Sequence, residues 1–137
     1  MAFKIRRVHY YSLSVPEEPS EACALLDQFS ELGVNMLAFS AVPAGPTRTQ
    51  LSLFPEDNGK LESFSRQAGI HLDGPHGALL VQGDDEMGAL AKVHTELQRA
   101  GVQVYASSGV ADGRGGYGYV IYVRATDLDK AAAALGI

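Results

Sequence analysis

Two short acidic loops carry residues whose types and spacing could bind a small charged ligand. The first lies within residues 14–22 and the second within residues 82–90, each between a predicted strand and a predicted helix. The N–H groups and the positive dipole end at a helix start favour a carboxylate. The acidic side chains disfavour a bare anion, and they suit an amino group or a metal ion better.

The acidic residues also have a purely structural interpretation. Asp and Glu before or within a first helical turn stabilise the helix, by about 0.3–1 kcal/mol each. From the residues alone, we favour this interpretation for Glu17, Glu18 and Glu86. Glycine in the second loop would let a ligand approach the backbone closely, which favours binding there.

No catalytic, metal or cofactor site is expected elsewhere. The four histidines have no metal-ligand spacing, and the single Cys23 has no CxxC partner and no indicated base. We interpret Cys23, in the middle of a predicted helix, as a small buried residue. The glycine-rich residues 113–118 precede a strand, whereas a dinucleotide loop follows one, so we expect a hairpin turn. A small enzyme therefore ranks last among the possible functions.

Composition excludes several classes of partner. The chain has 137 residues, a net charge of −5 and 46% hydrophobic residues, so it is globular in character. The acidic balance argues against a nucleic-acid partner, and the apolar runs are too short to span a bilayer. No signal peptide is visible, and one cysteine is compatible with a reducing compartment, so we expect a cytoplasmic protein.

The elements that must position the loops occur twice. Residues 32–45 align with residues 100–113 at an offset of 68, and residues 68–70 align with residues 135–137 at 67. In the first copy we predict strands at 8–15, 34–42 and 49–53, helices at 19–32 and 58–68, and a short strand beginning at 70–72. In the second copy we predict strands at 78–82, 102–110 and 117–123, and helices at 90–100 and 127–135.

The order βαββαβ in each copy predicts an α+β fold of two ferredoxin-like sandwiches, with both helices on one face of each sheet. Gly74-Pro75 is the predicted boundary, which gives domains 1–73 and 74–137. The second copy ends before its last strand, which would leave an inner strand unpaired. Our hypothesis is that residues 3–7, from the same chain or a partner, complete that sheet.

The duplicated order of strand, acidic loop, helix, Gly-Val and strand resembles a tandem ACT-domain protein. The resemblance rests on residues 14–22 followed by Gly33-Val34-Asn35, and on residues 82–90 followed by Gly101-Val102-Gln103. It covers nearly the whole chain. It implies a regulatory protein that binds an amino acid or similar small molecule between paired domains, as a homodimer. The alternative is an interaction subunit of a metabolic enzyme whose own ligand pockets are degenerate.

The resemblance also implies positions for the ligand. The candidates are Glu17, Glu18, Pro19, Ser20 and Asn35 in the first copy, and Gly83, Asp84, Asp85, Glu86, Met87, Gly88 and Gln103 in the second. Ser20 stands where the family prefers Gly, so we expect the first site to be closed. Met87 stands where Pro is common, but Gly88 is kept. The second loop is therefore the favoured ligand contact, with Asn35 and Gln103 contributing from a neighbouring domain.

Overall fold

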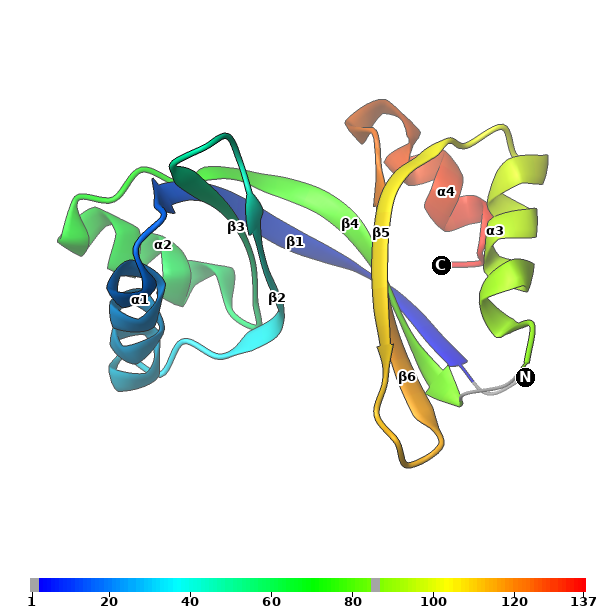
Figure 1. The fold of residues 1–137 in the computed structure, drawn as a ribbon. Helices are drawn as coiled ribbons and strands as arrows, with labels where there is room; N and C mark the ends of the chain where they lie inside the picture. The colour runs from blue at the N-terminus through cyan, green and yellow to red at the C-terminus, as the bar shows by residue number, and fades with distance from the viewer. Residues whose placement is uncertain (1–2, 85–86) are drawn as a thin grey trace. The chain divides into compact units, whose positions relative to one another are not determined.

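A computed structural model describes residues 3–84 and 87–137 (Figure 1). Its elements follow the predicted order along the chain. They are β1 (Phe3–Pro16), α1 (Pro19–Glu31), β2 (Met36–Pro43), β3 (Arg48–Pro55), α2 (Asn58–Ala68), β4 (Asp73–Asp84), α3 (Ala89–Arg99), β5 (Val104–Ala111), β6 (Gly116–Val123), the 3-10 turn η1 (Ala125–Asp127) and α4 (Leu128–Ala134).

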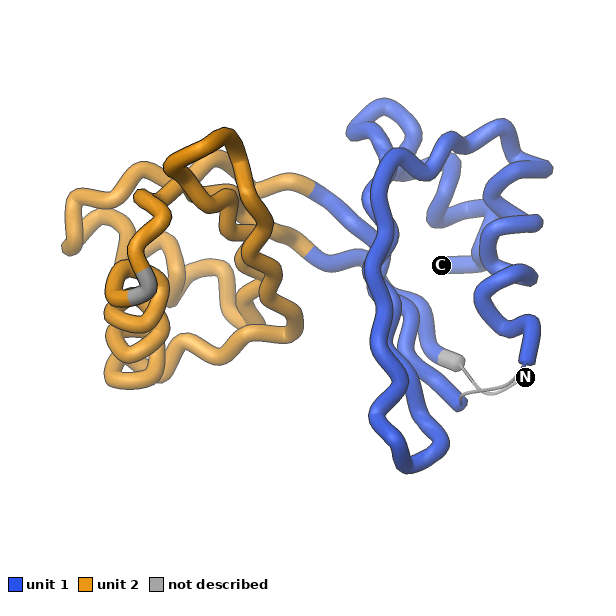
Figure 2. The backbone as a smooth tube through the Cα atoms, in the orientation of Figure 1, with its two compact units in different colours: residues 1–8, 77–137 blue, residues 9–76 orange. Residues whose placement is uncertain are grey.

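The chain forms two compact units (Figure 2). Unit 1 contains residues 1–8 and 77–137, and unit 2 contains residues 9–76. The antiparallel strand order is β2-β3-β1-β4-β6-β5. Unit 1 takes the first part of β1 and most of β4, and unit 2 takes the remainder of both strands. Each unit therefore has four strands in the ferredoxin-like order, and the predicted α+β fold is confirmed.

The core of unit 2 lies between its sheet and the two helices α1 and α2, which cover one face of the sheet (Figure 1). Phe29 of α1 meets Phe64 of α2 edge to face, with ring centroids 5.0 Å apart. Leu51 and Leu53 alternate along β3 and point into this core. Helix α2 begins at Asp57, whose side chain accepts hydrogen bonds from the first-turn amides as a cap should.

The core of unit 1 lies under α3 and α4. The N-terminal arm, which we define as residues 3–8 of β1, also contributes to it. Val93 and Leu97 of α3 pack there against Ile121 of β6. Ile5 of the arm packs against the same cluster, and Arg7 pairs with Asp129 of α4 at 2.8 Å. The arm is the neighbour of β4 in the sheet. The hypothesis that the arm completes this sheet is thus confirmed, in its same-chain form.

The predicted domain boundary at Gly74-Pro75 lies within a continuous strand. Residues 70–72 form no strand, and β4 instead runs from Asp73 to Asp84 through Gly74-Pro75. The glycine that signals a turn in the sequence serves a close approach of two backbones here. A Cβ placed on Gly74, which has φ 147°, would lie 2.8 Å from the carbonyl oxygen of Tyr10. The sequence boundary drawn after residue 73 therefore falls within β4, three residues before the point where the compact units divide.

Two details of the helices also differ from expectation. Cys23 is exposed, because the buried positions of α1 are Leu25 and Phe29, and Cys23 lies outside that stripe. In α3, Ala89, Val93 and Leu97 form the buried stripe, whereas Leu90 is 37% exposed. The apolar spacing of α3 favours Leu90 as the first buried position, but Ala89 takes that position. The Leu90 side chain is therefore accessible at the surface.

Candidate ligand site at the start of helix α3

A hollow of about 410 Å³ lies in unit 1 between the first turn of α3 and the ends of β5 and β6 that meet at their hairpin. Its volume falls within the range of about 300–1,000 Å³ that is typical of small-molecule sites. Most of its lining is glycine, alanine and other apolar residues. The lining residues are Gly88, Ala89, Leu90, Ala91, Gly109, Val110, Ala111, Tyr117, Gly118 and Tyr119.

The α3 wall of the hollow is the start of that helix. Gly88 is the N-cap, in the left-handed conformation with φ 81°, and no described side chain caps the helix there. The amide of Lys92 donates to the carbonyl of Gly88 at 3.1 Å. The amides of residues 89–91 precede that bond, so they have no partner within the helix. This wall can therefore donate hydrogen bonds to a carboxylate.

The opposite wall is fixed by Tyr119, whose ring lies across Gly109 of the neighbouring strand. A Cβ on Gly109 would lie 2.6 Å from Tyr119 Cδ1, so only glycine leaves room for the ring. The Tyr119 hydroxyl is 2.6 Å from His94 Nε2 and donates to Ser107 Oγ at 2.8 Å. Because these partners come from α3 and β5, the hydrogen bonds tie three elements together behind the hollow.

The hairpin between β5 and β6 is fixed by Asp112. Its Oδ1 accepts hydrogen bonds from the amides of Arg114 and Gly116, at 2.6 Å and 3.0 Å. These bonds, Arg114 first, lower the pKa of the Asp112 carboxyl below its usual value. The Asp112 amide also donates to the Gly116 carbonyl at 2.9 Å. The glycine-rich run is therefore a hairpin turn, as predicted, and it positions Tyr117 and Gly118 in the lining.

The structure places the candidate residues of the second copy unequally. Gly88 lines the hollow, whereas the Met87 side chain is fully exposed beside it. Gly83 pairs with Tyr117 across the sheet and Asp84 pairs with Gly116, so both lie on the strand next to the lining. The predicted contacts at residues 85 and 86 lie outside the described residues. Gln103 follows the other end of α3, about 16 Å along the helix from Gly88.

The corresponding loop of the first copy is engaged in local contacts. The Glu17 amide donates to the Thr47 carbonyl at 2.8 Å. Glu18 is the N-cap of α1, but its side chain accepts no bond from the helix, so it is not a side-chain cap. Ser20 is exposed in the first turn, next to Pro19 at the helix start. Residues 17–20 adjoin one another along the chain at the start of α1.

Asn35 has a structural partner. Its side-chain amide donates to Glu56 Oε2 at 2.7 Å, and its carbonyl accepts from the Glu56 amide at 2.8 Å. A hollow of about 440 Å³ in unit 2 lies over the start of α2 instead, where Asp57 already accepts the first-turn amides. The start of α2 therefore differs from the start of α3, because its first-turn amides already have a side-chain acceptor.

Sequence reasoning missed the strand residues that form half of the lining. Tyr119, Gly109 and Gly118 were not predicted as ligand contacts, although their signal is present in the sequence. A glycine within a strand marks a close approach of another group, and Gly109 and Gly118 both interrupt predicted strands. The register between β5 and β6 decides which tyrosine lies over which glycine. That register places Gly109 opposite Tyr119.

No metal or membrane feature accompanies the hollow. Within residues 3–84 and 87–137, no three His, Cys, Asp or Glu side chains cluster closely enough to hold a metal ion. None of the described helices has the length and apolar character needed to cross a membrane. The chemistry that the hollow offers is therefore hydrogen bonding from backbone amides beside an apolar surface.

Comparison with known proteins places the fold. The sequence matches no protein-family model and no curated protein. Protein BT0572 from Bacteroides thetaiotaomicron has a similar structure, with a TM-score of 0.81 and 16% identity over 96% of this chain and 88% of that one. The ligand-free regulatory subunit of aspartate kinase from Thermus thermophilus gives a TM-score of 0.65 and 15% identity, over 98% and 95% of the two chains.

The regulatory subunit of aspartate kinase from Thermus flavus is similar to the same degree, with a TM-score of 0.62, 15% identity and the same coverage. At these identities the likeness establishes the fold. It extends over both copies of the repeat, because nearly the whole of each chain is aligned. The chain therefore shares the fold of these solved structures, with two ferredoxin-like α+β units formed by one polypeptide.

Proposed function

We propose that this protein is a non-catalytic regulatory protein that binds an amino acid in the hollow at the start of α3. The observation that carries the proposal is the first turn of α3, which no described side chain caps and whose residues line a hollow of about 410 Å³. The tandem ACT resemblance implies a ligand contact at this same loop. Solved structures of similar fold are named as regulatory subunits of aspartate kinase, which supports a regulatory role.

The hollow suits each part of an amino acid. The carboxylate would accept hydrogen bonds from the amides of residues 89–91, helped by the positive end of the α3 dipole. An apolar side chain would lie against Leu90 and Tyr119. The amino group would face the acidic end of β4, where Asp84 is exposed beside Gly116. An apolar amino acid therefore fits the lining better than a simple anion does.

A thermal-shift and calorimetry panel of the twenty amino acids tests the proposal on the intact protein. A ligand at 100 times its Kd stabilises the folded state by about 2.7 kcal/mol, which is a readily measured shift in melting temperature. We expect one or a few apolar amino acids to give this shift. If no amino acid stabilises the protein at millimolar concentration, amino-acid binding is refuted.

Two substitutions at Leu90 separate ligand binding from helix stability. Leu90→Glu puts a negative charge in the first turn of α3, which stabilises the helix but repels a carboxylate ligand. Leu90→Lys puts a positive charge there, which destabilises the helix but attracts a carboxylate ligand. We expect Leu90→Glu to weaken binding by at least about tenfold, while Leu90→Lys retains it. Equal loss in both variants would mean that the apolar contact alone matters, and equal retention would place the ligand elsewhere.

The proposal includes a homodimer that forms through β5. This strand is at one end of the sheet, carries no charged residue and is exposed along nearly its whole length, with Val110 74% exposed. As the last strand in the sheet order, β5 has one edge that could pair with another strand, and its sequence holds no charge or proline that would block pairing. We expect Ser108→Lys to give a monomer of 14.6 kDa in light scattering, whereas Ser30→Lys on α1 leaves a dimer. A monomeric wild-type protein would contradict this part of the proposal.

The second candidate function is an interaction subunit that regulates a metabolic enzyme without binding a ligand of its own. The same uncharged strand β5 favours it, because a strand of a partner enzyme could pair there instead of a second copy. Wild-type protein that binds no amino acid and is monomeric in isolation would favour this candidate. A reducing, cytoplasmic location is compatible with either function and is supported by the single Cys23.

A further inference from the structure

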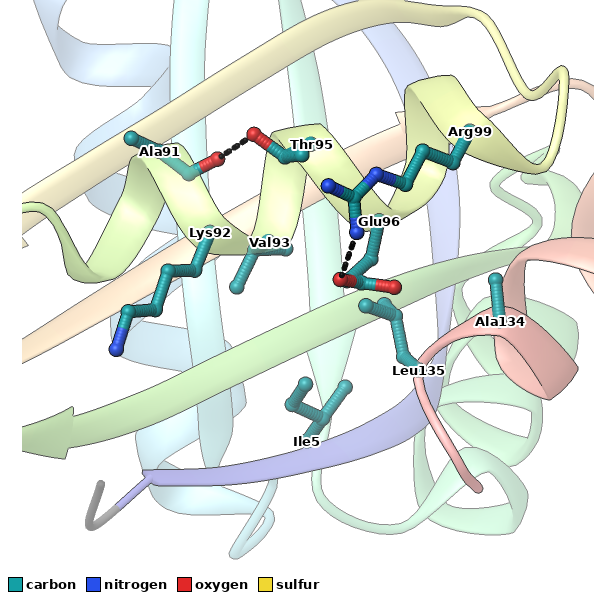
Figure 3. Close-up of a pocket in the computed structure, with 9 residues that line it drawn as sticks. All are labelled: Ile5, Ala91, Lys92, Val93, Thr95, Glu96, Arg99, Ala134 and Leu135. Atoms are coloured by element: carbon teal, nitrogen blue, oxygen red, sulfur yellow. Dashed lines mark hydrogen bonds and ion pairs between the residues drawn. The ribbon is translucent and has the colours of Figure 1, made fainter.

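A second hollow, of about 540 Å³, lies in unit 1. It is bounded by α3, by the end of α4 and by the N-terminal arm, and no described residue of β5 or β6 lines it (Figure 3). Neither the repeat nor the ACT resemblance assigns a role to it. Its lining residues are Ile5, Ala91, Lys92, Val93, Thr95, Glu96, Arg99, Ala134 and Leu135.

The floor of this hollow is apolar. Ile5 of the arm, Val93 of α3 and Leu135 after α4 are directed toward the same space (Figure 3). Ile5 and Leu135 are each only partly buried, although both pack against the core of unit 1. A ligand that covered them would remove more apolar surface from water, which is favourable in proportion to the area buried.

The rim of this hollow is cationic. Glu96 is paired with Arg99 at 3.4 Å, so its charge is partly offset within the rim. Lys92 extends away from that pair (Figure 3), and its ammonium group has no ion-pair partner among the residues that the structure describes. Two cations against one anion give the rim a net charge of +1, in a chain whose overall charge is −5.

We propose that this hollow binds an aliphatic carboxylate, with its head group at Lys92 and its hydrocarbon chain over Ile5, Val93 and Leu135. Among the described residues of this lining, Lys92 is the one cation without an ion-pair partner, and it matches one carboxylate. The apolar floor matches an alkyl chain. The floor offers no described acceptor for a second polar head. Because the ligand would contact the arm, α3 and the end of α4 together, its binding would strengthen the attachment of the arm to unit 1.

Sodium octanoate, kept below its micelle concentration, is the probe, and calorimetry on the full chain is the measurement. Octylamine and 1-octanol have the same chain with a positive and a neutral head group. We expect saturable octanoate binding at one site, weaker octanol binding and no octylamine binding. Hexanoate should bind less tightly, by up to about fourfold for each methylene that reaches the floor. Absent octanoate binding, or equal affinity for octylamine, would overturn the proposal.

Variants locate the site. Lys92→Gln removes the head-group contact, and we expect it to weaken octanoate binding by about tenfold. Ala134→Leu fills part of the space, and we expect it to weaken binding without removing a core side chain. Lys130→Gln on α4, whose ammonium lies 3.8 Å from Asp127 and outside the hollow, is the matched control and should bind as the wild type does. Unchanged affinity in both Lys92→Gln and Ala134→Leu would refute the assignment.

Leu90→Glu separates this site from the amino-acid site. Leu90 lines the hollow beside Gly88 and is not part of the lining that contains Lys92. We therefore expect octanoate affinity to be the same in this variant as in the wild type. A loss of octanoate binding in Leu90→Glu would mean that octanoate occupies the start of α3, and the proposal would fail.

Discussion

At the scale of single residues, Gly109 and Tyr119 decide the shape of the candidate ligand site. The ring of Tyr119 occupies the space that a side chain on Gly109 would need, and its hydroxyl reaches His94 and Ser107 from there. A residue pair from adjacent strands thus builds one wall of the hollow. The opposite wall depends on the left-handed conformation of Gly88, which glycine adopts without strain.

Gly109→Ala is expected to destabilise the protein by about 1–3 kcal/mol, because its Cβ forces Tyr119 out of place and overpacks the site. Gly118→Ala is the control. Gly118 lies on the paired strand, and a Cβ there has no atom within 4 Å. Its effect should be small or slightly stabilising, because alanine restricts the unfolded chain. Denaturant unfolding of the two variants measures both effects, and equal stabilities would contradict the packing described for Tyr119.

A second prediction at this scale concerns Tyr11, which is buried in unit 2 and donates its hydroxyl hydrogen to Glu62 Oε1. Burial, and then the hydrogen bond and charge of Glu62, raise the pKa of Tyr11 far above its ordinary value of 10.0. Above pH 10 the unfolded chain therefore loses this proton while the folded chain keeps it. The contribution of Tyr11 to stability is fully present below pH 10 and is lost as pH rises beyond it.

Tyr11→Phe should accordingly lower the free energy of unfolding at neutral pH by about 1–2 kcal/mol, through loss of a hydrogen bond to a charged group. It should also flatten the fall in stability above pH 10. Urea unfolding at several pH values between 8 and 11 measures both effects. Parallel pH profiles for the variant and the wild type would show that Tyr11 titrates alike in the folded and unfolded chains.

At the scale of elements, apolar spacing was sufficient to predict the helices. The helices predicted at residues 19–32 and 58–68 correspond to α1 and α2, and the Asp57 cap and the left-handed Gly69 at the two ends of α2 follow local rules. The extent of β1 and β4 was not predictable in this way. Gly74-Pro75 is a turn signal by local rules, and only the close approach of Tyr10 makes it part of a strand.

The residues of the candidate site likewise include some that the sequence predicts and some that it does not. Gly88 was predicted as a contact from the repeat and from its position in the ACT resemblance, and it lies in the lining of the hollow. The strand residues Gly109 and Tyr119 reach the hollow through long-range pairing, which spacing in the sequence does not reveal. Asn35 was predicted as a contact, yet its amide pairs with Glu56, a residue that is distant in sequence.

Deletion of residues 2–7 tests the role of the arm. Without it β4 loses its neighbour, and the core of unit 1 loses the contact with Ile5. We expect faster hydrogen exchange in α3, β6 and α4, with a smaller change in α1 and α2. Lys4→Ala, at an exposed position of the arm, is the control and should exchange as the wild type does. Unchanged exchange in α3 and α4 after the deletion would show that the arm does not support unit 1.

At the scale of the whole molecule, the duplication is unequal. Each copy supplies three strands and two helices, and each compact unit takes its fourth strand from a long strand shared along the chain, β1 or β4. The open helix start with its hollow occurs in unit 1, whereas the corresponding residues 17–20 of unit 2 are engaged locally. We therefore expect ligand binding to depend on unit 1.

Binding of an amino acid at the first turn of α3 is tested most directly by NMR. The uniformly ¹⁵N-labelled protein is titrated with the amino acid that gives the largest thermal shift, and every backbone amide is followed. We expect saturable changes that are largest for the amides of residues 88–91 and of Gly109 and Gly118. Saturable changes confined to residues 17–20, or the absence of any saturable change, would contradict it.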